Sequence, residues 1–317
     1  MNEQHTFIQI LARRWSSYLL VITHLLILFL FFSGSWWWRP RWVFAETTPA
    51  FIREAMLQGA GSDAYTAVSF ARFAHTPLII MIFSLWVLMG FRGLRQLVLS
   101  GRWYWVLSFG LAIFWIVLSI GWSVENSFAA QNQASQWFLV FLLVLVISCV
   151  GPSTRMVSLA ILGGAVFQAL LGIVQTLLQH EVGIHLVDDR VFRIGIGIYE
   201  FDLNPELSGA NVIQSNGMRF LRAQGLTPHP NLLAPVLVLG VLSSFWLWQH
   251  ASKSRAMVIV MHVIMLWGLF LTFSRASIGG LVLGTMLLGI SSLTTKQINR
   301  HEWRAFLVLL GFLAGLF

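Results

Sequence analysis

The sequence has few charged residues, since Asp, Glu, Lys and Arg make up 10% of its 317 residues while 57% are hydrophobic. A soluble domain carries about 25% charged residues, which it needs to cover its surface. The composition therefore excludes a soluble globular protein and predicts an integral membrane protein. The net charge of +8 does not indicate nucleic-acid binding, because the basic residues are dispersed between apolar runs instead of forming one patch.

Cysteine is almost absent as well. The single Cys149 lies in an apolar run, which excludes an internal disulfide or a cysteine-based metal site. There is no Walker loop, Rossmann glycine pattern, HExxH or GxSxG, so ATP hydrolysis and soluble hydrolase chemistry have no support. Asp188 and Asp189 alone would make a poor site for a divalent cation. We therefore expect no metal and no cofactor.

Long apolar runs are what the sequence has in place of these features. A transmembrane helix needs about 20 apolar residues, and nine runs approach that length, the last ending in mid-span at Phe317. They cover residues 17–38, 75–91, 103–122, 136–151, 156–178, 231–249, 256–273, 277–293 and 305–317. We expect an all-α, multi-spanning helical bundle, with N-terminal transmembrane helices in 1–150 and a second transmembrane region in 151–317 that is incomplete at its C-terminus.

The connecting loops predict the orientation of this bundle. With the N-terminus inside, eleven of the 20 Lys and Arg residues fall in short inner loops, as cytoplasmic loops require. The loop at 123–135 then lies outside and carries no Lys or Arg. Tryptophans 36, 37, 38 and 42 would form an aromatic belt at the outer interface. We expect a multi-pass protein of the cytoplasmic (inner) membrane with a cytoplasmic N-terminus.

Two longer segments fall on the outer side. Residues 39–74 contain an apolar-periodic stretch around 51–57 that predicts an interfacial helix. Residues 180–230 are the most polar part of the chain. Within them, 191–202 alternates apolar with polar or small residues, the period of a strand, and Ser215-Asn-Gly217 lies between two short strand-like stretches, a pattern typical of a hairpin. We expect a small, β-containing extracytoplasmic cap at 180–230.

Two arginines at the end of this outer segment are candidates for binding an anion. Arg219 and Arg222 are three residues apart and can converge on a phosphate or pyrophosphate, since the planar guanidinium fork makes paired hydrogen bonds to such oxygens. The alternative is an ion pair within the same segment. The acidic residues available there are Asp188, Asp189, Glu200 and Asp202.

The stretch Thr227-Pro-His-Pro-Asn231 follows directly. Its two prolines fix the backbone and remove two N–H donors, so His229 is held between rigid neighbours. The imidazole is a candidate acid–base group or hydrogen-bond donor to substrate, and the alternative is a structural turn with a solvent-facing ring. Asn231 is a reasonable N-cap for the next span.

A second candidate lies in the turn Ser274-Arg-Ala-Ser277, between two apolar runs with almost no loop. A charge such as Arg275 at this depth costs a few kcal/mol unless it is paired or faces water. It either extends to the headgroups or lines a site, with Ser274 supporting it. Two histidines inside spans, His24 and His262, are interpreted as packed or hydrogen-bonded, and Gly280-xxx-Gly284 as a helix-packing motif.

These residues resemble the O-antigen ligase and Wzy-type O-antigen polymerase superfamily. The matching pieces are Arg222-Ala-Gln-Gly-Leu-Thr-Pro-His-Pro-Asn-Leu-Leu-Ala234 and Leu271-Thr-Phe-Ser-Arg-Ala-Ser277 with its glycine-bearing continuation. A weaker match is Gly172-Ile-Val-Gln175. The similarity covers roughly residues 155–293. Family members carry a further large outer loop with a His that looks like the acceptor base, and this sequence ends before any such loop.

The resemblance implies a GT-C-type membrane glycosyltransferase of lipopolysaccharide or cell-envelope polysaccharide biosynthesis. Such an enzyme moves a glycan from an undecaprenyl-pyrophosphate carrier to an acceptor hydroxyl, on lipid A core or a polymer end. By this analogy Arg222 and Arg275, with Arg219, hold the pyrophosphate, and His229 is the candidate catalytic residue. The expected partners are a lipid-linked oligosaccharide donor, a glycolipid or glycan acceptor, and membrane lipids.

Two other classes of protein remain open. One is a transporter or flippase for an amphiphilic, anionic lipid-linked sugar, which would bind the same ligand without making a bond. The other is a non-catalytic membrane subunit. Transporters often contain inverted halves with helices broken near the bilayer midplane, whereas this sequence has one hairpin near the interface and a long outer segment.

Overall fold

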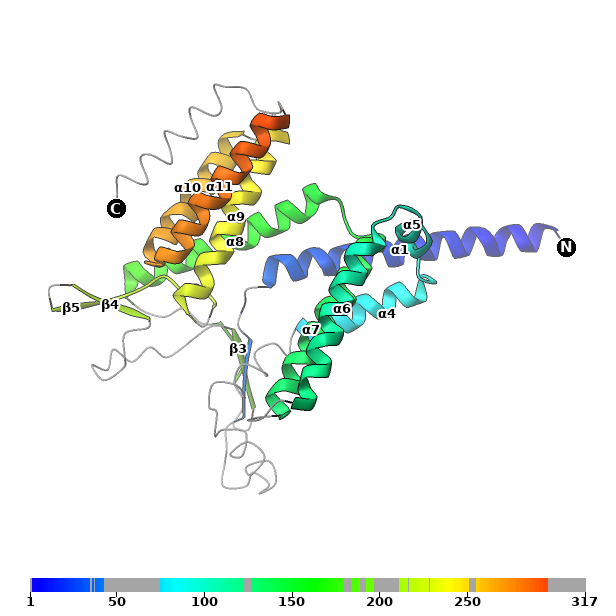
Figure 1. Ribbon diagram of the computed structural model, residues 1–317, viewed down its shortest axis with the longest axis horizontal. Helices are drawn as coiled ribbons and strands as arrows, with labels where there is room; N and C mark the ends of the chain where they lie inside the picture. Colours follow the sequence, from blue (N-terminus) through cyan, green and yellow to red (C-terminus); the bar gives the residue numbers. More distant parts are fainter. Residues whose placement is uncertain are drawn as a thin grey trace, which may run out of the picture. The chain divides into compact units, whose positions relative to one another are not determined.

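The computed structural model describes residues 2–34, 36, 38–42, 75–122, 127–179, 184–188, 192–196, 211–215, 217–227, 229–250 and 255–295. In these ranges the chain is mostly helical (Figure 1). It divides into two compact units, one made of Met1–Val157 with His185–Ile196 and the other of Ser158–Ile184 with Gly197–Phe317.

The helices are long and apolar. Among the described residues, three are long and apolar enough to cross a membrane, namely Trp15–Ser33, Trp103–Trp122 and Thr154–Leu178. Five shorter apolar helices accompany them: His75–Leu88, Ala134–Val150, Pro230–Phe245, Ala256–Leu271 and Arg275–Ile290. Helices of this length and composition are those of a membrane protein.

The first unit contains α1 (Asn2–Ser33), α4 (His75–Leu88), α5 (Leu94–Leu99), α6 (Trp103–Ser119), the 3-10 turn η2 (Ile120–Trp122) and α7 (Ser127–Val150). Its core forms where α1, α4 and α7 meet, around the fully buried Ile27, Ile82 and Val146. His24 Nε2 lies 2.7 Å from the carbonyl oxygen of Val150, which confirms the interpretation of this histidine as hydrogen-bonded.

A three-stranded sheet belongs to the same unit. Its order is β1 (Trp38–Trp42), β3 (Phe192–Ile196), β2 (Ile184–Asp188), and β1 pairs antiparallel with β3. The strand β3 confirms part of the strand expected at 191–202. The first span was predicted to continue to residue 38, and this boundary is wrong: α1 ends at Ser33 and the chain then enters β1. Backbone pairing with a distant strand has overridden the continuing apolar run.

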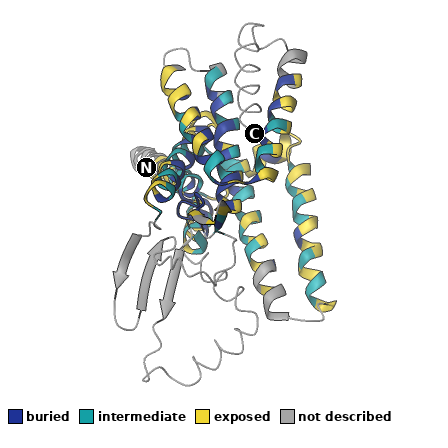
Figure 2. Ribbon diagram, turned by 90° about the vertical axis from the view of Figure 1, so that its left-hand side faces the viewer, coloured by how far each residue is buried: buried dark blue, intermediate teal, exposed yellow. Residues whose placement is uncertain are grey.

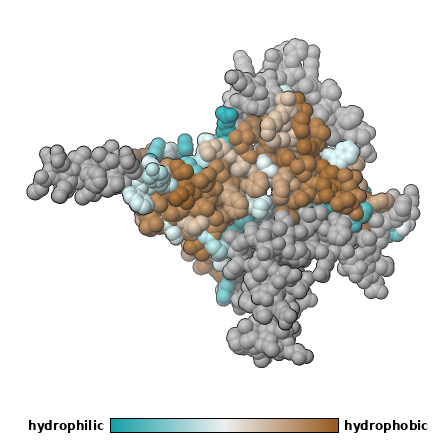
Figure 3. Space-filling view, turned by 180° about the vertical axis from the view of Figure 1, so that it is seen from behind, coloured by the Kyte–Doolittle hydropathy of each residue, from teal (hydrophilic) through white to brown (hydrophobic). Residues whose placement is uncertain are grey.

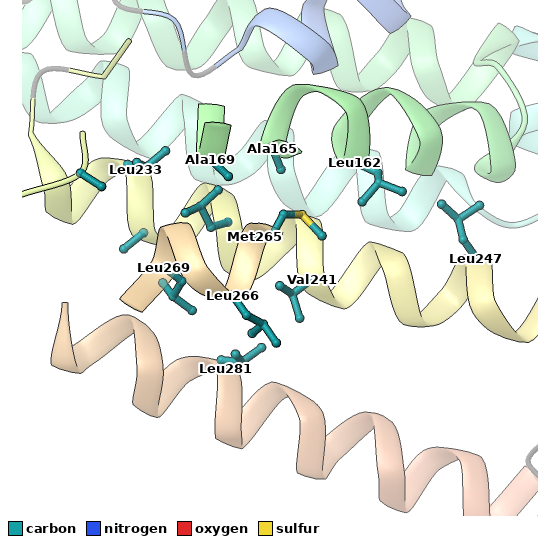
Figure 4. Packing of buried hydrophobic residues seen from close by; sticks show 13 residues of the cluster. Leu162, Ala165, Ala169, Leu233, Val241, Leu247, Met265, Leu266, Leu269 and Leu281 are labelled. Carbon is teal, nitrogen blue, oxygen red and sulfur yellow. The ribbon is translucent and has the colours of Figure 1, made fainter. Parts of the chain in front are cut away.

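The second unit is built on α8 (Thr154–Leu178), α9 (Pro230–His250), α10 (Arg255–Leu271) and α11 (Arg275–Thr295). Figure 4 shows side chains from all four helices pointing toward one another, among them Ala169, Leu233 and Met265, which are completely buried. Small residues let these helices approach closely. A Cβ on Gly268 would lie 3.0 Å from Ala169 Cβ, and one on Gly240 would lie 2.4 Å from Ala165 Cβ.

A two-stranded hairpin, β4 (Val212–Ser215) and β5 (Met218–Leu221), leads into α9. Gly217 in the connection has φ 79°, a left-handed conformation that hairpin turns require and glycine adopts easily. The hairpin predicted around residues 215–217 is therefore confirmed. The interfacial helix expected at 51–57, the last span at 305–317 and most of the 180–210 segment lie outside the described residues.

The described helices expose much of their apolar side. Buried and exposed residues occupy opposite faces of the same helices in Figure 2, and brown apolar residues dominate the described surface in Figure 3. In the second unit, Val263 on α10 and Leu283 on α11 are more than half exposed. A soluble protein rarely exposes so large an apolar surface, so these faces suit contact with lipid.

Candidate anion-binding site

A cavity of about 710 Å³ lies at one end of the second unit. Both arginines singled out from the sequence, Arg222 and Arg275, line it. The remaining lining residues come from α9, from the α10–α11 turn and from the start of α11: Asn231, Pro235, Val238, Phe273, Ser274, Ala276, Ser277 and Gly280. Among these described lining residues there are two cations and no carboxylate.

The two arginines line one cavity because the ends of α9, α10 and α11 lie close together. The C-terminal end of α10 lies beside the segment that precedes α9, since Ala223 N donates to Leu271 O at 2.9 Å. Only residues 272–274 separate α10 from α11, so α11 begins at the same end. Phe273 takes a φ of 51° in this turn, a left-handed conformation that is costly for a bulky residue and typical of a helix C-terminus. The tight turn places Arg275 in the lining of the same cavity as Arg222.

Arg222 is held by the protein itself. The residue is only 9% exposed, and its Nε donates to Thr272 O at 2.8 Å while its Nη2 donates to Asn231 Oδ1 at 2.9 Å. Thr272 follows the last residue of α10, where helix carbonyls lack helical partners and carry a partial negative charge. Burial lowers the pKa of Arg222 from its usual value, but an arginine side chain stays charged in proteins.

These contacts bear on the ion-pair alternative for Arg222. Its guanidinium donates to a carbonyl oxygen and to an amide oxygen. Of the four acids considered as partners, Asp189, Glu200 and Asp202 lie outside the described residues. In the described contacts, then, Arg222 caps α10 and orients Asn231.

Arg275 has a different environment. It is the first residue of α11 and is exposed, and in the described part of the chain its guanidinium makes no hydrogen bond or ion pair. Ser274 caps the helix: its carbonyl oxygen accepts from Ile278 N at 3.1 Å, and its hydroxyl donates to Ser277 Oγ at 3.1 Å. The positive end of the α11 dipole therefore adds to the charge of Arg275.

His229 lies beside this site and is not one of the residues lining the cavity. Its Nδ1 accepts a hydrogen bond from Asn231 N at 3.0 Å, so the neutral ring carries its proton on Nε2. Burial, and next the positive charge of Arg222, lower the pKa of His229 from its usual value. Of the acid–base and donor roles predicted for this residue, the tautomer inferred from this contact favours a hydrogen-bond donor over a base.

Asn231 has a different role from the one expected. An N-cap was predicted there, but α9 begins at Pro230, and the carbonyl oxygen of His229 accepts from Leu232 N and Leu233 N. His229 is therefore the capping residue, and Asn231 sits in the first turn with its side chain free to bind Arg222. Arg219 lies in β5, where its backbone pairs with Gln214, and its side chain is outside the described part of the structure.

The sequence reasoning missed a set of glutamines on α8 and immediately after it. Gln179 Oε1 accepts from Leu221 N at 2.8 Å, and Gln168 Oε1 accepts from Leu226 N at 2.7 Å. Between them, Gln175 donates from Nε2 to Gly225 O at 2.8 Å and accepts from Gly225 N at 2.8 Å. We call Gln168, Gln175 and Gln179 the glutamine seam.

The seam completes the hydrogen bonding of the segment that carries Arg222. Every backbone N–H from Leu221 to Thr227 donates: four to the seam, and the others to Asn211 O, Leu271 O and Gln224 O. The signal was present in the sequence, because uncharged polar residues on one side of an apolar helix are costly unless they are hydrogen-bonded. Gln175 entered the sequence analysis only as part of a family resemblance.

Glycines let the segment lie close to α8. Gly225 has φ 59°, and a Cβ there would lie 2.4 Å from Gln168 Oε1. On the helix, a Cβ at Gly172 would lie 3.0 Å from Ala223 Cβ. Of the Gly280-xxx-Gly284 motif, only Gly284 faces another helix, with Leu242 beside it, whereas Gly280 opens onto the cavity.

No family model matches this chain, and neither a curated protein nor a solved structure matches it.

Proposed function

We propose that this protein is a membrane glycosyltransferase that moves a glycan from an undecaprenyl-pyrophosphate carrier to an acceptor hydroxyl, on lipid A core or a polymer end. The observation that carries the proposal is the presence of Arg222 and Arg275 in the lining of one cavity. One cation is fixed before any ligand arrives, and the other is exposed. Together they suit a ligand with two linked phosphates.

The charge of the cavity supports a role in leaving-group departure. In this reaction the acceptor oxygen attacks the anomeric carbon, the bond from that carbon to the pyrophosphate oxygen breaks, and negative charge builds on the pyrophosphate. Cations already aimed at that charge lower the barrier. Asn231 in the first turn of α9 and Ser274 at the start of α11 bring two helix N-termini to the same place, and helix N-termini favour phosphate groups.

The rest of the cavity suits a lipid-linked ligand. Pro235 and Val238 on α9 and Phe273 and Ala276 beside Arg275 are apolar, so one cavity offers cations and a hydrocarbon surface. Ligand pockets commonly measure about 300–1,000 Å³, and this one falls in that range. A pyrophosphate with the first part of a polyprenyl chain combines the same two properties.

The proposal includes a membrane arrangement. The N-terminus lies in the cytoplasm, about nine spans form the bundle, and the cavity opens to the outer side of the cytoplasmic membrane, beneath a cap at 180–230. In support, one end of the second unit holds the C-terminal ends of α8 and α10 together with the N-terminal ends of α9 and α11. Helices that cross a membrane in alternating directions would have their ends arranged in this way.

His229 is the candidate catalytic residue in this scheme. It would donate from Nε2 to the substrate in the observed tautomer. To act as the base that takes the acceptor's proton at Nε2, the ring must first carry its proton on Nδ1, which breaks the bond from Asn231 N. Arg219 is assigned to the pyrophosphate with Arg222 and Arg275 on the sequence spacing alone.

A second candidate function is binding or flipping of a lipid-linked anion without chemistry, as a transporter or non-catalytic subunit. One observation favours it: the described lining residues include two cations but no carboxylate or imidazole that would serve as a base. The two candidates share the ligand and differ in whether a bond is made.

Transfer by the purified protein separates them. The assay supplies a glycan on a polyprenyl diphosphate and an acceptor glycan, and it measures both donor binding and product. Arg275→Ala should abolish transfer while the protein still inserts, and Arg155→Ala, an exposed arginine near the start of α8, should leave the rate unchanged. Normal transfer by Arg275→Ala would refute the proposed role. Donor binding by the unaltered protein without product would favour the second candidate.

A further inference from the structure

The position of Arg222 depends on α8, which contributes no residue to the cavity lining described above. Arg222 is three residues from Gly225, and Gly225 is bonded on both its N–H and its carbonyl by the side chain of Gln175. Gln175 is completely buried and Gly225 is buried. A single carboxamide thus replaces the two-point pairing that a neighbouring strand would provide.

Gln175 holds this segment through a donor and an acceptor at the same peptide. It donates to Gly225 O and accepts from Gly225 N, while Gln168 accepts from Leu226 N and Gln179 accepts from Leu221 N. Because the clamp uses one donor and one acceptor on one residue, it fixes the direction of the peptide plane as well as its distance. The 222–226 segment then has a single backbone register against α8, which fixes the position of the Arg222 Cα and therefore the point from which its side chain extends.

We propose that Gln175 is a positioning residue that sets Arg222 in register for the anion, acting through the backbone of Gly225. The inference rests on the proposed binding of a diphosphate at Arg222 and Arg275. It makes a membrane-embedded helix part of the anion site. A shift of the 222–226 backbone would pull Nε and Nη2 away from Thr272 O and Asn231 Oδ1, so the orientation of the guanidinium would be lost with the register.

The variant Gln175→Glu tests this because its chemistry changes with pH. A protonated glutamic acid has one O–H donor and one acceptor oxygen, so it restores the clamp on Gly225. An ionised one sets a negative oxygen against the carbonyl of Gly225 and breaks the clamp. Burial raises the pKa of a glutamic acid, in documented cases to about 8–9, so the acid form is reachable under mild conditions.

Other groups that bear on the measurement are known. The ionisable residues on the described elements of this unit and in the segment that Gln175 holds are Arg155, Arg219, Arg222, His229, His250, Arg255, His262 and Arg275. The arginines stay charged. Because His229 and pyrophosphate themselves titrate, the quantity compared is the ratio of variant to unaltered affinity for inorganic pyrophosphate at each pH.

The experiment measures inorganic pyrophosphate binding in detergent micelles from about pH 5 to about pH 9, for the unaltered protein, Gln175→Glu, Gln175→Leu and Thr176→Val. Thr176 is the neighbour of Gln175 and bonds within its own helix, to Gly172 O, so Thr176→Val should match the unaltered protein throughout. Gln175→Glu should bind normally at low pH and about tenfold or more weakly at high pH. Gln175→Leu should be weak at every pH.

Each result decides something. Normal pyrophosphate binding by Gln175→Leu overturns the positioning role, because leucine cannot form the clamp. A Gln175→Glu protein that is equally weak at all pH values overturns it as well, because the loss of binding then does not depend on the donor that the acid form supplies. If the unaltered protein does not bind pyrophosphate, the proposed function fails instead. Unfolding curves at both ends of the pH range identify any variant that is simply misfolded.

Discussion

Replacing Gly225 with Ala is expected to destabilise the second unit by about 2–5 kcal/mol. Gly225 has φ 59°, and an L-residue in that conformation costs about 1–2 kcal/mol. The new Cβ would also lie 2.4 Å from Gln168 Oε1. Gln168 must then move, and the buried N–H of Leu226 loses its acceptor, which costs about 1–3 kcal/mol.

Gly217→Ala is the matched control for this change. Gly217 has a φ of 79°, and a Cβ there meets nothing within 4 Å, so this variant carries the conformational cost without the clash. Unfolding by denaturant titration in mixed micelles measures both. Gly225→Ala should cost about 1–3 kcal/mol more than Gly217→Ala and should weaken pyrophosphate binding, which Gly217→Ala should not. Equal stabilities would refute the account of the seam as a close support for the 222–226 backbone.

Three further outcomes are expected. Gly280→Leu should obstruct the cavity and weaken binding of a polyprenyl diphosphate, whereas Gly279→Leu, at an equally open position outside the described lining, should not; ligand titration of the two proteins compares them. Asn231→Asp should keep the contact with Arg222 but place a negative charge in the cavity, so pyrophosphate affinity should fall about tenfold or more at low salt and less at high salt. Burial and Arg222 lower the pKa of His229 in the folded protein. The contribution of neutral His229 to stability is therefore complete above the unfolded pKa of about 6.5 and is lost as the pH falls through the pKa of the folded state. The unfolding temperature should drop on acidification, and it should drop less in His229→Asn.

Much of the fold could be predicted from the sequence, because apolar runs of membrane-span length have few structures open to them. Each of the first eight predicted spans coincides with a helix, from α1 to α11. The errors lie at the ends. The helix α7 begins at Ser127, well before the predicted 136, since its first turns contain polar but uncharged residues that lower hydropathy without breaking a helix. The short α5 was not predicted, because six residues are too few for a periodic signal.

The candidate site divides in the same way. That Arg222 and Arg275 share a cavity was foreseeable, since both motifs flank helix ends that alternate in direction. The contacts that orient Arg222 were not. They depend on carbonyls at the end of α10 and on glutamines some fifty positions earlier in the chain, and no local pattern reports such pairings. His262, interpreted as packed or hydrogen-bonded, does lie within 2.8 Å of Ser244 Oγ through its Nδ1, and this interpretation is confirmed.

The two arginines differ in how far the protein orders their side chains before an anion binds. Arg222 spends two donors on Thr272 O and Asn231 Oδ1 before any ligand arrives, so its orientation costs little when an anion binds, which is the advantage of a pre-organised site. Arg275 is exposed at the start of α11 and must be ordered by the ligand. Arg222 therefore fixes where the anion binds, and Arg275 adds an exposed positive charge that attracts it. A lysine at position 222 could not replace the arginine, because its point charge lacks the planar fork that contacts two oxygens at once.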